Sequence, residues 1–492
     1  MVNAPREPVA SVAAPHAATA TGTIVDDALP DLHQRLAAAR AGFAADPFPS
    51  AAVRRDRLDR LLDVLDDERG FVAALDADFG HRSAHETRLA ELYVVSAEVR
   101  HARRHVARWM RPRRIATPLR LWPGRAYVMP QPRGVVGVIS PWNYPVQLAL
   151  APVAGALAAG NRVLLKPSEL TPATSALLVA RIAARFAPDE LAVVEGGADV
   201  GAAFAALPFD HLFFTGSTSV GRSVARAAAE NLVPVTLELG GKSPAVFDEG
   251  ADLARLAPRL MVGKLLNSGQ TCIAPDYALV PRAEVDAFVA AVRAATDTLY
   301  PAARRAVDYT TIVSERHHAR LAALVEDARR RGATIVTLDR ADGHARHFAP
   351  TLVVGVDDTM AVMREEIFGP ILPVEAYEGL DDALRRIAAR PHPLALYWFG
   401  ADDARLARVL RETRAGGVTV NDTLWHFAHE GLPFGGVGAS GQGVYHGEHG
   451  FRTFSLDKPV FVQRRLAPSR LLHPPYGAAF DRMLALLRGL RL

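Results

Sequence analysis

The sequence predicts an α/β protein built from two doubly wound domains, each a mainly parallel sheet with helices on both faces. Its 492 residues are more than one hydrophobic core usually holds, and 49% of them are apolar. Short apolar runs alternate four times with helical segments between residues 135 and 230. A second series of the same kind begins near Pro244 and reaches residues 418–420. Repeated strand–helix units are typical of parallel sheets wrapped by helices.

The first series is expected to form a dinucleotide-binding sheet. We predict strands at residues 135–139, 162–165, 191–194 and 211–214, followed by helices near residues 146–159, 171–186, 200–207 and 219–230. The segment before them, residues 31–109, is predicted to be helical. Its apolar residues recur three and four positions apart, as at Leu58, Leu61 and Leu65. In the second series we predict a helix at residues 320–331 and strands at residues 333–337 and 418–420.

A proline-rich segment separates the N-terminal helices from the first sheet. Five prolines lie between Pro112 and Arg133 and interrupt a short extended run at residues 125–129. Because proline breaks regular structure, we expect this segment to leave the domain as an arm.

Composition excludes several kinds of protein. The formal net charge of only +4 does not predict a nucleic-acid partner. The longest apolar stretch, residues 146–159, contains Pro152 and Gly155 and falls short of the ~18 residues that a membrane helix needs. The 17 histidines show no metal-ligand spacing, so no metal is predicted, and His317 and His318 are expected on a solvated helical face.

The first 25 residues are rich in Ala, Pro and Thr and lack the apolar core of a secretory signal. We therefore expect residues 1–25 to form a disordered tail and the protein to be cytoplasmic. A cytoplasmic location also suits the only cysteine of the chain, which must stay reduced.

That cysteine, Cys272, is predicted to be a nucleophile. A lone thiol cannot form an intramolecular disulfide and is not expected in a thiolate metal cage. By the burial habits of free cysteine alone, it would more often be a small buried side chain than a catalyst. However, Gly269, Gln270 and Thr271 are poor core residues and indicate a loop that holds the thiol in a strained, accessible place.

A phosphate site is expected where a strand of the first series meets its helix. Residues 215–221 follow a strand and open a helix, so backbone N–H groups and the helix dipole could hold a pyrophosphate there. The pattern G-x-G-x-x-G occurs at residues 436–441, but no strand precedes it and we expect a turn-rich loop. Residues 240–243 resemble the end of a P-loop, but Thr236 stands where its first glycine is needed.

Six motifs, in order along the chain, resemble those of the NAD(P)-dependent aldehyde dehydrogenase superfamily. They are Pro141-Trp-Asn-Tyr-Pro145, Lys166-Pro-Ser-Glu169, Phe214-Thr-Gly-Ser217, Leu237-Glu-Leu-Gly-Gly-Lys242, Gly269-Gln-Thr-Cys272 and Glu366-Ile-Phe-Gly-Pro370. Further segments are similar to the class 3 branch, and to coniferyl-aldehyde dehydrogenases in particular: Ala274-Pro-Asp-Tyr277, residues 391–397, Asn421-Asp422 and residues 432–438. The resemblance covers all but the N-terminal tail and the stretch after about Arg465.

The resemblance implies an aldehyde dehydrogenase-like fold with a cofactor domain, a catalytic domain and a small β bridging element for oligomerisation. The implied division is a dinucleotide-binding domain of residues 26–109 and 131–239, a catalytic domain of residues 240–430, a bridging element of residues 110–130 and 431–465, and a C-terminal tail of residues 466–492. A homodimer is expected, as for class 3 members.

It also implies the chemistry. Cys272 is expected to attack an aldehyde carbonyl, with the Asn143 side-chain amide and the Cys272 backbone N–H as oxyanion donors. Glu238 resembles the general base that activates water to hydrolyse the resulting thioester. The implied cofactor is NAD, with NADP possible, and its expected contacts are Lys166, Glu169, Gly216, Ser217, Gly221, Glu366 and Phe368. The expected substrate is an aromatic or medium-chain apolar aldehyde, coniferyl aldehyde among them, oxidised to its acid.

Alternatives remain open at this stage. Asn143 could simply cap the following helix, Glu238 could be an exposed strand-end carboxylate, and Phe368 could be ordinary core packing. Tyr144, Trp425 and Phe427 could line an apolar substrate tunnel or belong to the core. A CoA-acylating aldehyde dehydrogenase would not need the carboxylate of Glu238, and a non-catalytic paralogue would not need the set of Cys272, Glu238 and Asn143.

Overall fold

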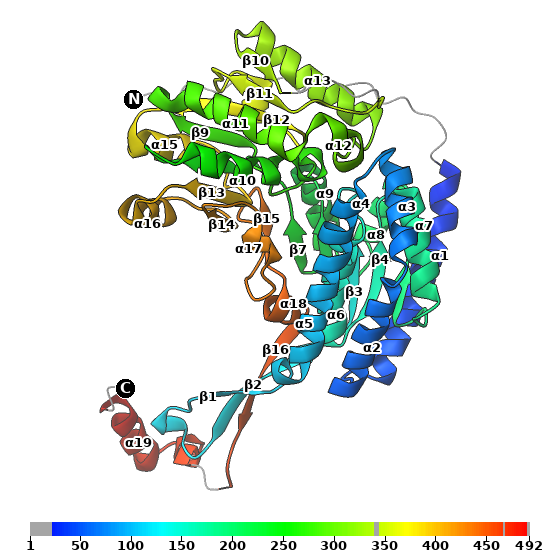
Figure 1. The fold of residues 1–492 in the computed structure, drawn as a ribbon. Helices are drawn as coiled ribbons and strands as arrows, with labels where there is room; N and C mark the ends of the chain where they lie inside the picture. Colours follow the sequence, from blue (N-terminus) through cyan, green and yellow to red (C-terminus); the bar gives the residue numbers. More distant parts are fainter. Residues whose placement is uncertain (1–21, 339–343, 466–467, 490–492) are drawn as a thin grey trace, which may run out of the picture.

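The computed structural model describes residues 22–338, 344–465 and 468–489 (Figure 1). Residues 1–21, most of the expected N-terminal tail, lie outside the described part. The chain forms one large, mainly parallel sheet in each of two lobes and a smaller antiparallel sheet in a projecting arm. The predicted α/β class, with two domains and a small β element, is confirmed.

The first domain holds a six-stranded sheet in the order β15-β7-β6-β3-β4-β5. Its strands are β3 (Val135–Ile139), β4 (Arg162–Lys166), β5 (Leu191–Val193), β6 (His211–Thr215), β7 (Val235–Glu238) and the short β15 (Gly441–Gln442). All neighbours are parallel except β15 and β7. The chain runs outward from β3 through β4 to β5 and then returns to β6 on the other side. The carboxyl ends of β3 and β6 therefore flank a topological switch point, where open α/β sheets bind ligands.

The predicted apolar helix of this domain is α6 (Gln147–Ala159), and every one of its residues is buried. It packs between α5 and the sheet, which explains why its sequence has no polar face. Helices on both faces of the sheet are α1 (Gly22–Ala45), α2 (Ala51–Val64), α3 (Glu68–Phe79), α5 (Val94–Trp109), α7 (Pro172–Ala183), α8 (Ala198–Ala205) and α9 (Thr218–Ala229). The short α4 (Ala84–Glu86) and a π-helical turn (Thr87–Tyr93) lead into α5. Within the described ranges, no helix has the length and apolar character needed to cross a membrane.

The second domain holds a seven-stranded sheet in the order β10-β11-β12-β9-β8-β13-β14. Its strands are β8 (Pro244–Phe247), β9 (Tyr277–Pro281), β10 (Thr334–Thr337), β11 (Thr351–Val354), β12 (Ile371–Tyr377), β13 (Ala395–Phe399) and β14 (Gly417–Val420), all parallel to their neighbours except β10. Its helices are α10 (Leu253–Leu265), α11 (Val285–Leu299), α12 (Ala302–Asp308), α13 (Glu315–Arg330), α14 (Ala361–Arg364), α15 (Gly379–Ala388), α16 (Asp403–Glu412) and α17 (Trp425–Ala428). The predicted helix at residues 320–331 starts earlier, at Glu315, because the Ser314 side chain caps it by accepting the His317 N–H.

The arm is the three-stranded antiparallel sheet of β1 (Arg113–Ile115), β2 (Arg125–Pro132) and β16 (Ser455–Val462). It projects away from both lobes, and α19 (Ala478–Gly489) lies near its far end (Figure 1). Between the second domain and β16 the chain returns to the first domain, where β15 pairs with β7 and α18 (Gly447–Thr453) packs on α5 and α6.

Candidate active site

A cavity of about 240 Å³ opens at the carboxyl edge of the first sheet, beside the switch point between β3 and β6. Residues predicted from the sequence that line it are Asn143, Gly216, Ser217, Glu238, Cys272, Glu366 and Phe368. Three others, Lys166, Glu169 and Gly221, do not line it. The first domain supplies one wall, and the thiol and the loop after α14 come from the second domain. The site therefore exists only where the two domains meet.

The thiol of Cys272 follows a tight left-handed turn. After α10 the backbone φ angles of Asn267, Ser268 and Gly269 are +52°, +52° and +73°. A side chain at Gly269 would collide with the Gly369 carbonyl, so glycine is required there. This strain agrees with the predicted loop, and it leaves Cys272 half-buried at the cavity wall while its neighbours are buried.

The surroundings of Cys272 favour its thiol form over the thiolate. Burial, with the carboxyl groups of Glu366 and then Glu238 nearby, raises its pKa to about 12. Burial is the largest cause, and any negative charge on Glu366 or Glu238 disfavours the thiolate further. The nucleophile must therefore gain its negative charge during the reaction, beside a positive group or by losing its proton to a base.

We expect the alkylation rate of Cys272 by iodoacetamide, measured without cofactor, to rise about tenfold per pH unit up to at least pH 9. Below a pKa of about 12 the thiolate is the minor form, and its fraction grows tenfold with each pH unit. The chain has a single cysteine, so the mass of the labelled protein follows one site. A rate that levels off near pH 8 would show instead that the pKa of this thiol is not raised.

Asn143 points at the cysteine loop rather than at the helix that follows it. Its side-chain Nδ2 donates to the Gln270 backbone carbonyl at 3.0 Å. The backbone carbonyl of Asn143 accepts hydrogen bonds from the side chains of Arg82 and Asn267. The first N–H groups of α6 are instead capped by the carboxylate of Glu91. Asn143 is 2% exposed, and its amide is held against the backbone of Gln270, which lies two positions before Cys272.

Glu238 ends β7 and is 3% exposed, with neither carboxylate oxygen bonded to another group of the described protein. Burial raises its pKa well above the ordinary value. It is therefore not an exposed strand-end carboxylate. The raised pKa makes the ionised carboxylate a stronger base, and in a cavity that also holds a thiol it can accept a proton from water.

The remaining part of the cavity suits a dinucleotide. Gly216 follows β6, and Ser217 caps α9 by accepting the Val220 N–H, so this helix N-terminus can face an anionic group. A side chain at Gly240 would collide with the Glu366 carboxyl group, so glycine lets this carboxyl group lie against the backbone of residue 240. Burial, and then Asp276, raise the pKa of Glu366 to about 8.

Phe368 forms a wall of the cavity rather than part of the core. Its φ angle of +52° is unusual for an aromatic residue, and its ring meets Trp142 edge-on with centroids 5.4 Å apart. Among the residues proposed for an apolar tunnel, Tyr144 is 6% exposed and Trp425 is 63% exposed. Phe427 packs against Phe434.

Three predicted cofactor residues do not line the cavity. Lys166 and Glu169 lie at the end of β4 and just after it, and Gly221 lies in α9. Lys166 ends β4, and its Nζ donates to Glu169 Oε2 at 3.3 Å. Glu169 is 46% exposed and so remains open to a ligand. Gly221 lies in α9 under the Leu239 side chain, where any larger residue would collide, and this packing accounts for the glycine.

The sequence did not single out Trp142, His317 and Arg320 as part of the cavity. His317 is only partly solvated, because one side of its half-buried ring packs edge-on against Trp142, with the centroids 5.0 Å apart. Arg320, one turn further along α13, donates to the Glu366 carbonyl and holds the loop before Phe368. Helical periodicity predicts that His317 and Arg320 lie on one face of α13. It does not predict that this face meets the other domain.

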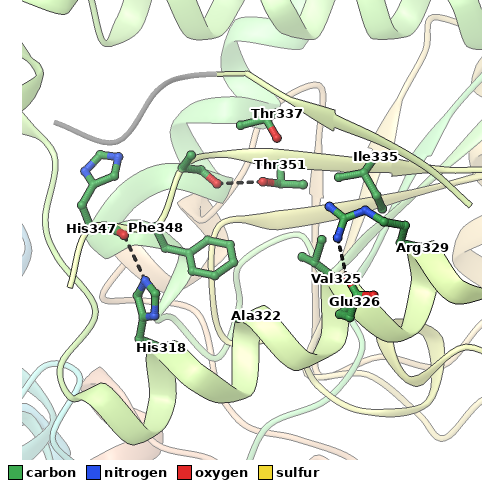
Figure 2. A pocket seen from close by; sticks show the side chains of 11 residues that line it. His318, Ala322, Val325, Glu326, Arg329, Ile335, Thr337, His347, Phe348 and Thr351 are labelled. Carbon is green, nitrogen blue, oxygen red and sulfur yellow. Dashed lines mark hydrogen bonds and ion pairs between the residues drawn. The ribbon is translucent and has the colours of Figure 1, made fainter. Parts of the chain in front are cut away.

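A second cavity, of about 460 Å³, lies over α13, β10 and β11 (Figure 2). His318 and Phe348 line it, and the His318 ring bonds the His347 carbonyl at 3.1 Å across it. Neither a thiol nor a buried carboxylate lies among its lining residues. It therefore offers no group for the chemistry considered above.

Comparisons with known proteins show which family the chain resembles. The family model described as "Aldehyde dehydrogenase family" matches residues 2–460. A probable coniferyl aldehyde dehydrogenase of Pseudomonas aeruginosa is 50% identical, over 90% of this chain and 94% of that protein. A coniferyl aldehyde dehydrogenase of Pseudomonas sp. is 47% identical, over 88% and 92% of the two chains.

Solved structures are similar over the same length. The structure of Staphylococcus aureus AldH in its substrate-bound state has a TM-score of 0.88 and 38% identity, covering 93% of this chain and 99% of that chain. Mycobacterium tuberculosis aldehyde dehydrogenase complexed with NAD+ has a TM-score of 0.78 and 30% identity, covering 89% and 90%.

Proposed function

The chain belongs to the aldehyde dehydrogenase family, and we propose that it oxidises an aromatic or medium-chain apolar aldehyde, coniferyl aldehyde among them, to the carboxylic acid. It is an NAD(P)-dependent enzyme, as its family and its relatives indicate. The substrate class is supported by the names of relatives that share about half of its sequence, one a probable coniferyl aldehyde dehydrogenase and one a coniferyl aldehyde dehydrogenase.

In the proposed mechanism, the Cys272 thiol gives its proton to water as the sulfur attacks the aldehyde carbonyl, and the oxyanion that forms accepts hydrogen bonds from the Asn143 amide and the Cys272 backbone N–H. Gly216, Ser217, Glu366 and Phe368 would hold NAD in this cavity, where it would supply the acceptor for the hydride of the aldehyde carbon. The product on the enzyme is a thioester. Glu238 then removes a proton from water, which attacks the thioester and releases the acid and the thiol.

The observation that supports this function best is that Cys272, Glu238 and Asn143 share one cavity. A CoA-acylating enzyme has no use for a buried carboxyl group in the cavity of the thiol, and a non-catalytic paralogue has no use for any of the three. The test is to incubate the enzyme with coniferyl aldehyde and NAD, with and without CoA, and to identify the products. We expect NADH and the acid in equal amounts in both reactions. Acyl-CoA as the main product, or no reaction, would favour one of the alternatives.

For the cofactor we propose a preference for NAD with measurable NADP activity. Glu169 is half-exposed on the sheet edge, where its carboxylate could accept a ribose 2′-hydroxyl and repel a 2′-phosphate. Lys166, 3.3 Å from it, acts in the opposite direction.

Replacing Glu169→Gln is therefore expected to shift the ratio of kcat/KM values for NADP and NAD toward NADP, by about tenfold, since the repulsion in a partly exposed site is modest. Glu230→Gln, which neutralises an exposed carboxylate at the far end of α9, serves as the control and should leave the ratio unchanged. An unchanged ratio in Glu169→Gln would mean that this residue does not contact the ribose.

We also propose a homodimer in the cytoplasm. The arm stands clear of both lobes and exposes apolar side chains such as Ile115 and Phe461, and β14 is an open edge of the second sheet. A second copy that covers the arm would bury these groups. A cytoplasmic location would keep the single thiol reduced, as the proposed role of Cys272 requires. Light scattering at micromolar concentration should give twice the chain mass of 52.9 kDa, and a monomer would contradict the proposal.

A further inference from the structure

A buried arginine lies directly behind Asn143. Arg82, in the loop between α3 and α4, is only 1% exposed. Its Nη1 donates to the Asn143 carbonyl at 3.0 Å, and its Nη2 forms an ion pair with Glu91 Oε1 at 3.0 Å. The guanidinium also lies over the rings of Phe79 and Tyr144, 4.6 and 5.2 Å from their centroids. A charge this enclosed is held in place by its partners, because burying it unpaired would be costly.

Glu91, the ion-pair partner of Arg82, binds the backbone a few residues after Asn143. Its Oε2 accepts the backbone N–H groups of Val146 and Gln147, at 3.1 and 2.7 Å, where α6 begins. Glu91 itself is 0% exposed. Arg82 therefore holds the segment from Asn143 to Gln147 at two points, once directly and once through Glu91.

The cysteine loop has an anchor of its own. The Asn267 backbone N–H donates to the Glu86 carboxylate, which also accepts the Thr310 hydroxyl at 2.7 Å. The Asn267 side chain then donates to the Asn143 carbonyl at 2.9 Å. Loss of Arg82 would leave this carbonyl with one donor from the other domain, while Cys272 would keep its loop.

We propose that Arg82 is a positioning residue that aims the Asn143 amide at the oxyanion. The proposal rests on the role of Asn143 given above. If it is correct, loss of Arg82 slows the reactions of Cys272 in which an oxyanion forms on a carbonyl. The rates of reactions of the same thiol without an oxyanion stay unchanged.

Two reagents separate these cases at the single cysteine. In acylation by p-nitrophenyl acetate, the sulfur bonds to the carbonyl carbon, an oxyanion forms and collapses, and nitrophenolate leaves. In alkylation by iodoacetamide, the sulfur bonds to the methylene carbon as iodide leaves, and no oxyanion forms. For Arg82→Met we expect acylation and aldehyde turnover to fall about tenfold or more, and alkylation to stay within about threefold of wild type. The dissociation constant of NAD should not change.

Arg54→Met is the matched control. Arg54 is also 1% exposed, and its Nη1 donates to the Ala158 and Ala159 carbonyls at the opposite end of α6. Its removal should lower the melting temperature but leave the ratio of acylation to alkylation rates unchanged. Arg82→Lys keeps a charge near Glu91 and should recover part of the ratio, and it replaces Arg82→Met in the test if that variant does not fold.

Asn143→Ala, measured in parallel, separates failure of this proposal from failure of the assignment on which it rests. If Asn143→Ala slows acylation and the Arg82 variants do not, Arg82 has no positioning role, although the proposed mechanism stands. A parallel fall of acylation and alkylation in the Arg82 variants would also overturn the proposal, because it would show displacement of the thiol. If Asn143→Ala leaves acylation unchanged, Asn143 is not the oxyanion donor, and both assignments fail.

Discussion

Cys272→Ala is expected to lower NAD-dependent aldehyde oxidation by a factor on the order of 10⁴ or more, with NAD binding within about twofold of wild type. Without sulfur no covalent adduct forms, and no other thiol in the chain can replace it. The remaining cavity wall is unchanged, because the left-handed turn that positions residue 272 ends before it, at Gly269. The measurements are initial rates of NADH formation and a titration with NAD.

Wild-type enzyme alkylated with one equivalent of iodoacetamide is the control for this variant, and it should lose activity in proportion to the label on the Cys272 peptide. Activity of a few per cent in Cys272→Ala, or active enzyme that is fully labelled, would show that the thiol is not the nucleophile.

Glu238→Gln is expected to cut steady-state turnover by a factor on the order of a hundred or more while the first turnover survives. Glutamine has the size of the native side chain but cannot take a proton from water. The thioester should therefore form and then persist. Stopped-flow absorbance should show a burst of NADH, close to one per subunit, followed by a slow steady state.

Glu98→Gln controls for the neutralisation of a buried carboxyl group, since Glu98 is 6% exposed, accepts the Gly447 N–H at 2.7 Å and does not line the cavity. It should show wild-type turnover and no burst. Turnover near wild type in Glu238→Gln would mean that Glu238 has another role. A slow rate without a burst would place its effect before hydride transfer.

Local patterns in the sequence were sufficient for most of the fold. The strands at residues 135–139 and 211–214 and the buried α6 follow from apolar periodicity over a few residues, which does not depend on distant contacts. The strained approach to Cys272 was also predictable, because Gly269 and its polar neighbours indicate a loop.

Contacts between distant segments were not predictable from these patterns. His317 lies on a helix whose polar sequence indicates solvent, yet Trp142 of the other domain covers one side of its ring. Arg82 belongs to no motif, and the Asn143 carbonyl that it binds is 61 positions away. The loop at residues 436–441 was expected to be rich in turns, and its last residue, Gly441, begins the two-residue β15 that pairs with Glu238 and Leu237. A pairing that short leaves no periodic signal in the sequence.

The proposed covalent mechanism is tested most directly by the mass of the peptide around Cys272 in Glu238→Gln enzyme quenched after one turnover with coniferyl aldehyde and NAD. The mechanism predicts that this peptide gains the mass of the acyl group, that hydroxylamine removes it, and that no acyl group appears when NAD is omitted. An unmodified Cys272 peptide from a reaction that has produced one NADH per subunit would contradict the mechanism.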